Sequence, residues 1–158
     1  MVVEMKVVSK GDTVKLNYIG RLAENNKLFD TSKEDVARAE GIFDQNRDYE
    51  PLEIKAGVGL LIKGFDDALM GMKVGEEKTV TIPPDLGYGH VKPEFIQELT
   101  SVLTSREREA MQVGHKITLP DGRTGRLLEI KGDKVKVDFN HELAGKTLVF
   151  KIEIVKIL

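Results

Sequence analysis

A short stretch between two glycines, residues 61–72, places the strongest constraint on how this chain folds. It reads LIKGFDDALMGM, and Phe65 and Leu69 are four residues apart, so they share one face of a short helix. Gly64 permits a sharp turn into that helix, and Gly71 suits its C-terminus. A helix of two turns does not hold together alone in water. It must therefore pack inside a larger structure, and the rest of the chain offers mainly strands.

Alternating apolar and polar residues predict strands on both sides of this helix. They lie at residues 14–18, 28–31, 51–55, 78–82 and 148–155. The last of them has apolar residues on both faces near its end, which is typical of a strand inside a sheet. Between 32 and 50 the sequence is polar, and we expect Ser32 to cap a brief helix that runs to Arg38 and stops at Gly41.

The pattern changes after Tyr88. Residues 95–111 are predicted to be helical or partly helical, and residues 117–139 form a run of hairpins with turns at Pro120-Asp121-Gly122 and Gly132-Asp133. The sequence therefore suggests two units: residues 1–88 together with 137–158, and an insert at 89–136. The insert has a thin core and would be marginal alone.

Charge and composition exclude several classes of function. The chain has 158 residues with 24 basic and 26 acidic side chains, and this near balance argues against a general nucleic-acid binder. The lysines at 131, 134 and 136 are interleaved with Glu129, Asp133 and Asp138, which makes a nucleic-acid surface there improbable. No apolar run approaches transmembrane length and no signal-peptide core is present, so no membrane contact is expected. The absence of cysteine favours a reducing, cytoplasmic location.

No metal or cofactor is expected either. The histidines at 90, 115 and 141 lack the spacing of metal ligands, so structural or solvent-facing roles are the default for them, with His141 as the functional candidate. Gly57-Val58-Gly59 is not followed by the residues of a phosphate-binding loop.

Several short motifs together carry a resemblance to a known family. They are YIG at 18–20, FDTS at 29–32, LIKGF at 61–65, PDLGYG at 84–89, NHELAGK at 140–146 and LVFKIE at 148–153. In this order they resemble the FKBP-type peptidyl-prolyl cis-trans isomerases, and NHELAGK is similar to the signature of the SlyD-like branch, in its short archaeal form. The resemblance implies an α+β, mostly-β fold, in which a twisted antiparallel half-barrel sheet surrounds one short α-helix. It also implies that the insert is an insert-in-flap domain.

The resemblance also implies a pocket for proline. Its lining falls on Tyr18, Phe29, Asp30, Leu52, Leu61, Ile62, Phe65, Tyr88 and Phe150, with His141 and Leu143 in a covering loop. Asp30, Tyr88, Ile62 and Phe150 take the catalytic positions, and Asp30 is expected to be hydrogen-bonded to Tyr18. Phe65 replaces the tryptophan of many relatives, and Leu52 replaces a common aromatic residue. Only weak binding of FK506-like macrolides is therefore expected.

Each of these residues also has a plainer interpretation. Without the resemblance, Leu61, Phe65 and Phe150 would be taken as core residues, and Asp30 as a turn cap or a surface acid. Tyr88 is harder to explain in this way, because a tyrosine between two glycines lies on an irregular loop and needs a reason to be placed there.

Two functions from different classes follow. The first is a monomeric isomerase that acts on Xaa-Pro bonds in unfolded or partly folded polypeptides, and that binds such chains through its insert as a chaperone. The second is a catalytically inert chaperone or peptide-binding module. The apolar residues that the insert offers for binding, or for its own small core, are Phe95, Ile96, Leu99, Leu103 and Met111.

Overall fold

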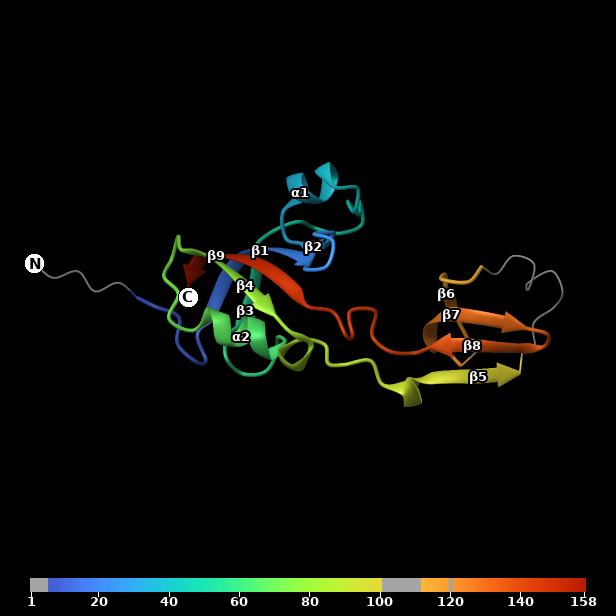
Figure 1. Ribbon diagram of the computed structural model, residues 1–158. Helices are drawn as coiled ribbons and strands as arrows, with labels where there is room; N and C mark the ends of the chain where they lie inside the picture. Colours follow the sequence, from blue (N-terminus) through green and yellow to red (C-terminus); the bar gives the residue numbers. More distant parts are fainter. Residues whose placement is uncertain (1–5, 101–111, 120) are drawn as a thin grey trace, which may run out of the picture. The chain divides into compact units, whose positions relative to one another are not determined.

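The computed structural model describes residues 6–100, 112–119 and 121–158, which divide into two compact units (Figure 1). The first unit extends to His90 and resumes at Gly145, and the second comprises Val91–Ala144. The sequence suggested boundaries at Tyr88 and Val137 instead. The difference arises because β8 (Lys134–Asp138) is hydrogen-bonded to strands of the second unit on both of its sides.

An antiparallel sheet forms the first unit. Among the described residues its five strands are β1 (Thr13–Leu22), β2 (Leu28–Thr31), β3 (Leu52–Lys55), β4 (Glu77–Ile82) and β9 (Leu148–Ile157). Their order is β2-β1-β9-β4, and β3 pairs with the N-terminal half of β1. The prediction that the last strand lies inside the sheet is confirmed, because β9 pairs with β1 on one side and β4 on the other.

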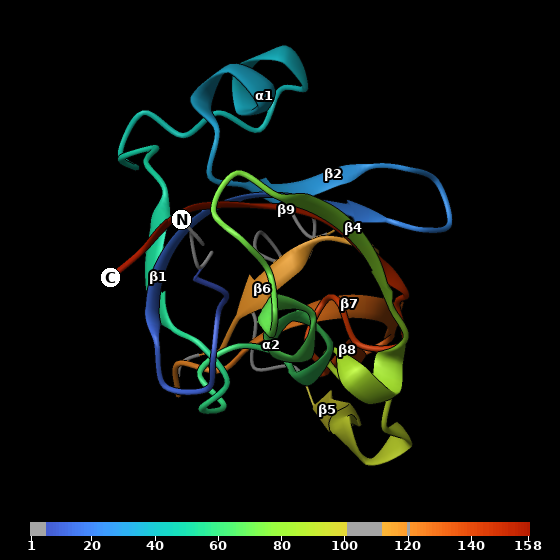
Figure 2. The same ribbon diagram turned by 90° about the vertical axis from the view of Figure 1, so that its left-hand side faces the viewer.

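The short helix predicted between the glycines is α2 (Lys63–Leu69), and the strands curve around it (Figure 2). It begins one residue before Gly64, so this glycine lies inside the helix and not in a turn that precedes it. Leu69 and Met72 are fully buried, together with apolar residues of β1 and β9. Gly64 allows close packing, since a Cβ atom there would lie 2.7 Å from Cγ2 of Ile82 on β4. Gly71, with a φ of +81°, follows the end of the helix as expected. Packing against the sheet thus supplies the stability that two helical turns lack.

A second helix, α1 (Glu34–Ala39), lies in the polar segment after β2, and its predicted cap was wrong. Ser32 makes no cap hydrogen bond; its buried hydroxyl donates to Asn17 Oδ1 at 2.9 Å and accepts from the Tyr18 N–H at 3.0 Å. The serine thus continues the pairing between β2 and β1. Gly41 follows the helix end as predicted, with a φ of +79°.

The second unit is a small antiparallel sheet in the order β5-β8-β7-β6. Its other strands are β5 (Ile96–Thr100), β6 (Lys116–Thr118) and β7 (Thr124–Lys131). The predicted helix is wrong for residues 96–100, which pair with β8, while Pro93–Phe95 form a 3₁₀ turn. The rest of that prediction, including Leu103 and Met111, lies outside the described residues. Leu127, Val135 and Val137 form a thin core.

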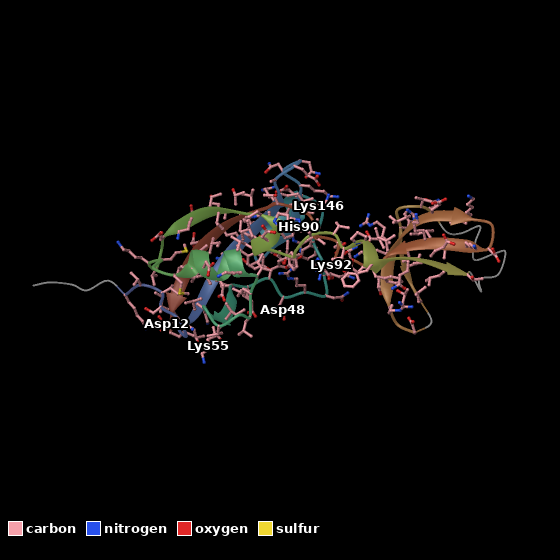
Figure 3. All side chains as sticks on the ribbon, turned by 60° about the horizontal axis from the view of Figure 1, so that its bottom comes forward. Asp12, Asp48, Lys55, His90, Lys92 and Lys146 are labelled. Atoms are coloured by element: carbon pink, nitrogen blue, oxygen red, sulfur yellow. The ribbon has the colours of Figure 1, made fainter. Side chains whose placement is uncertain are left out.

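Charged side chains cover much of both units. In Figure 3, Asp48 and Lys55 extend outward from the first unit, and both are exposed. Of the helices in the described part of the chain, none has the length and apolar content that a bilayer crossing requires.

Candidate functional site

Four aromatic rings meet in the first unit, and Phe150 on β9 lies at their centre. The Phe150 ring centroid is 4.9 Å from that of Phe65 on α2 and 5.5 Å from that of Phe29 on β2. Tyr18 on β1 completes the group, at 6.3 Å from both Phe65 and Phe150. Phe65 and Phe150 are buried, whereas Phe29 and Tyr18 are half-buried. The structure therefore brings together the four aromatic residues of β1, β2, α2 and β9 that the sequence placed in one pocket.

The close approach of these rings depends on Gly20, which lies on β1 opposite Phe150. A Cβ atom at this position would lie 2.7 Å from Cζ of Phe29 and 2.8 Å from Cε1 of Phe150. Real Cβ contacts are essentially never that short, so the two rings occupy the space of the missing side chain. Gly20, the last residue of the YIG motif, therefore has a packing role in the site.

A polar network lies beside the rings. The Tyr18 hydroxyl donates to Asp30 Oδ2 at 2.9 Å, as expected, and it accepts a hydrogen bond from Arg47 Nη2 at 3.0 Å. Arg47 Nη1 donates to Asp30 Oδ1 at 2.6 Å, and the Thr31 N–H donates to the same oxygen at 2.8 Å. The Asp30 side chain is 39% exposed, so this carboxylate lies at the edge of the aromatic cluster, within reach of solvent.

No role was predicted for Arg47 from the sequence, because residues 32–50 were described only as a polar segment with one brief helix; we call this segment the excursion. A series of ring contacts orders this segment. The Arg38 guanidinium lies 3.6 Å from the Phe43 ring centroid, Phe43 stacks on Tyr49 at 5.5 Å, and the Arg47 guanidinium lies 5.0 Å from the Tyr49 ring. Two aromatic and two arginine residues within a polar stretch are the signal that could have indicated such a structure.

The protonation of the two tyrosines follows from their surroundings. Burial, and then the negative charge of Asp30, raises the pKa of Tyr18 to about 12, although Arg47 acts in the opposite direction. Burial also raises the pKa of Tyr88, and the charge of Asp30 adds to this effect. Tyr88 follows the 3₁₀ turn Pro84–Leu86 and is 40% exposed, so it lies on the irregular loop that the sequence indicated. Both hydroxyls remain protonated at neutral pH and can act as hydrogen-bond donors.

The other predicted pocket residues lie on β3, in the turn before α2, and in the second unit. Leu52 on β3 is half-buried and pairs with Leu16 on β1. Leu61 and Ile62 are half-buried in the turn before α2, where the Ile62 carbonyl accepts the Phe65 N–H at 3.1 Å. His141 and Leu143 belong to the second unit, where the Leu143 N–H donates to His141 Nδ1 at 3.0 Å. That they cover the pocket stays a prediction.

Of the apolar residues proposed for the insert, Phe95 directly precedes the strand β5, and Ile96 and Leu99 belong to it. Phe95 is 43% exposed, with the Lys92 ammonium 5.5 Å from its ring centroid, and Ile96 is half-buried. Leu99 packs against the core of the second unit. Of the three, Phe95 is therefore the residue best placed to contact another molecule.

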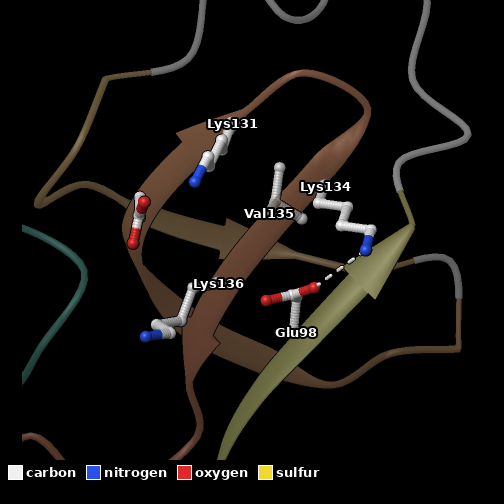
Figure 4. Close-up of a pocket in the computed structure, with 6 residues that line it drawn as sticks. Glu98, Lys131, Lys134, Val135 and Lys136 are labelled. Atoms are coloured by element: carbon white, nitrogen blue, oxygen red, sulfur yellow. Dashed lines mark ion pairs between the residues drawn. The ribbon is translucent and has the colours of Figure 1, made fainter.

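A hollow of about 390 Å³ opens on the second unit (Figure 4), but its lining is charged. Its walls are Glu98, Glu129, Lys131, Lys134, Val135 and Lys136. Lys134 Nζ lies 3.5 Å from Glu98 Oε1. This alternation of opposite charges suits a solvated sheet face and offers little to an apolar proline ring. The aromatic cluster of the first unit is the better candidate for a binding site.

Comparisons with known proteins identify the family of the chain. Residues 5–155 match the sequence model of the family described as FKBP-type peptidyl-prolyl cis-trans isomerase. The short-type peptidyl-prolyl cis-trans isomerase of Methanocaldococcus jannaschii is 43% identical over 150 residues, which cover 95% of this chain and 94% of that protein. The FKBP-type 16 kDa peptidyl-prolyl cis-trans isomerase of Escherichia coli is 35% identical over 117 residues, covering 68% of this chain and 74% of that protein. With its aromatic cluster, its half-barrel sheet and this similarity over nearly its whole length, the chain belongs to the FKBP-type peptidyl-prolyl cis-trans isomerases.

Proposed function

We propose that the aromatic cluster of the first unit binds the proline ring of a substrate and favours the twisted form of the preceding peptide bond. Rotation about that bond has a barrier of about 18–20 kcal/mol, because resonance keeps the amide planar. The twisted amide has less charge separation than the planar one and therefore loses less on leaving water. An apolar surface built from Phe29, Phe65 and Phe150 thus stabilises the transition state more than the ground state.

This reaction needs neither a nucleophile nor a base, because no covalent bond breaks. Lowering the barrier by about 7 kcal/mol would accelerate isomerisation roughly 10⁵-fold. In the proposal, the Tyr88 hydroxyl and the Ile62 backbone N–H hold the carbonyls of the bound peptide. Asp30 biases the electrostatics at the pocket edge, held there by Tyr18 and Arg47.

The observation that carries this proposal is the contact between the four-ring cluster and the Asp30–Tyr18–Arg47 network. NMR exchange spectroscopy on an Ala-Leu-Pro-Phe peptide measures the catalysed interconversion without a coupling enzyme. Relative to the wild type, Asp30→Ala and Tyr88→Phe should each lower kcat/KM by about tenfold, since each removes a charge or a donor that the proposal places beside the bound peptide. A wild-type protein that leaves the exchange rate unchanged, yet still suppresses aggregation, would instead be the inert binding module.

We further propose that the second unit binds unfolded polypeptide chains. Among the described residues, β5 lies at the edge of its sheet, and a sheet edge can capture an extended peptide through backbone hydrogen bonds, largely regardless of sequence. Phe95 adds an exposed apolar ring next to the start of that strand. A client held there has its proline tethered to the same molecule as the pocket, which raises the effective concentration of the bond to be isomerised.

A matched pair of variants tests the second proposal. Phe95→Ser removes the apolar ring beside β5, and Val113→Ser removes another exposed apolar side chain of the same unit, which is 61% exposed. The affinity for a fluorescently labelled, permanently unfolded protein is read from its anisotropy. Phe95→Ser should weaken binding several-fold while Val113→Ser leaves it unchanged. Equal affinities for both variants and the wild type would show that Phe95 does not contribute to the binding surface.

A further inference from the structure

Asp66 is the one acidic or basic side chain in the described part of the chain that is buried, at 6% exposure. It lies in the first turn of α2, directly after Phe65 of the aromatic cluster. Its two carboxylate oxygens accept hydrogen bonds from the preceding loop. Oδ1 accepts the Gly57 N–H at 2.6 Å, and Oδ2 accepts the Gly59 N–H at 3.0 Å. Nothing in the proposed chemistry uses this carboxylate, so its burial needs another explanation.

The same residue also holds the other end of that loop. The Asp66 backbone N–H donates to the Ile62 carbonyl at 3.0 Å, while its side chain holds Gly57 and Gly59. The segment from Gly57 to Ile62 is thus tied at both ends to one residue of α2. The bond to Ile62 is an ordinary backbone bond of the helix, whereas the two bonds to the carboxylate are charge-assisted and therefore stronger than bonds between neutral groups.

Apolar packing does little to hold the first part of this loop, residues 57–60, in place. Val58 is 42% exposed and Leu60 is 65% exposed, so neither side chain anchors the loop in the core. Gly57 and Gly59 have φ values of +77° and +83°, in a region that glycine adopts readily and other residues rarely do. Because glycine has the greatest backbone freedom of any residue, a loop with two glycines and exposed side chains needs a specific tether to hold one conformation.

We propose that Asp66 is a positioning residue for the isomerase reaction, which fixes the loop 57–62 so that Leu61 and Ile62 meet the substrate in one arrangement. The inference rests on the proposed role of the Ile62 N–H as a donor to the bound peptide. A misplacement of about 1 Å at a reacting group can cost a hundredfold in rate, so a tether of this loop has a direct kinetic consequence.

Asp66→Asn tests the proposal, because it keeps the side-chain volume while its amide group can accept only one of the two N–H groups. Asp67→Asn is the matched control, since Asp67 is its neighbour on α2, has a side chain 59% exposed and pairs with Lys63 at 3.1 Å. On the tetrapeptide, Asp66→Asn should lower kcat/KM about tenfold. Asp67→Asn should stay within about twofold of the wild type, as expected for an exposed ion pair. Amide hydrogen exchange at Gly57 and Gly59 should accelerate in Asp66→Asn alone.

A purely structural role for Asp66 would give a different result. Ile154→Val, in the buried core on β9, serves as a variant that lowers stability without touching the loop. If Asp66→Asn lowers thermal stability like Ile154→Val and keeps the wild-type kcat/KM, the inference is overturned.

If Asp66→Asn does not fold, Gly59→Ala strains the same loop at a position where a Cβ meets no atom within 4 Å. Its kcat/KM should then fall several-fold, and an unchanged value would contradict the proposal. If the wild-type protein itself has no isomerase activity, the proposed proline pocket is refuted, and not only the role of Asp66.

Discussion

The guanidinium of Arg47 lies 2.6 Å from the Asp30 carboxylate, although the two residues are separated by a helix and an irregular segment. This ion pair joins the excursion after β2 to the edge of the aromatic cluster. It gives the excursion a role in the site, because Arg47 also donates to the Tyr18 hydroxyl.

Replacing Arg47 should therefore reduce activity. Arg47→Leu removes both hydrogen bonds, and we expect kcat/KM on a tetrapeptide to fall about threefold to tenfold, the modest size reflecting a partly exposed pair. Arg47→Lys should retain an intermediate activity, because lysine keeps the charge but cannot bond both partners with a planar fork. Wild-type activity in Arg47→Leu would show that the ion pair only anchors the excursion.

Tyr18 should titrate at unusually high pH. Its pKa is raised to about 12, against about 10 for an unfolded chain, so the folded protein binds more protons than the unfolded one between these values. The stabilisation is complete below pH 10 and is lost as the pH rises toward 12. A spectrophotometric tyrosine titration should show an ionisation near pH 12 that Tyr18→Phe removes. A wild type without this late ionisation would contradict the environment described for Tyr18.

Gly20→Ala should disturb the aromatic cluster directly. The new methyl group would lie within 3 Å of the rings of both Phe29 and Phe150. Overpacking of this kind costs about 1–3 kcal/mol of unfolding free energy, which a urea titration would measure. Activity should fall as well, because the displaced rings form the proposed proline surface. A variant as stable and active as the wild type would mean that the rings move aside freely.

The sequence was most informative where one local rule decided the outcome. Two glycines and the spacing of Phe65 and Leu69 predicted α2 almost to the residue. Apolar residues on both faces of the last strand predicted the central place of β9 in its sheet. The aromatic pocket was harder to predict, since its rings come from four elements far apart in the chain. The family resemblance, rather than periodicity, brought them together.

The misses have physical causes as well. The apolar pattern of residues 95–100 is too short to separate a helix from a strand, and the hydrogen bonds of β8 decided in favour of the strand. The contacts of Arg47 and Asp66 depend on how two irregular loops close, which leaves no periodic trace in the sequence. Ser32 has the residue type of a helix cap, but pairing with β1 uses its hydroxyl instead.

One direct measurement tests whether the first unit catalyses isomerisation while the second unit binds the client chain. The Gly145 N–H donates to the Gly89 carbonyl at 2.7 Å within the first unit, so a short loop can replace residues 91–138 and leave His141 and Leu143, the predicted covering residues, in the chain. Turnover of a tetrapeptide and catalysis of a proline-limited refolding reaction are then compared between this variant and the full chain. We predict that kcat/KM on the tetrapeptide stays within about threefold, because the pocket belongs to the first unit, whereas catalysis of refolding falls at least about tenfold as the tethering of the client is lost. Equal losses on both substrates would contradict the account.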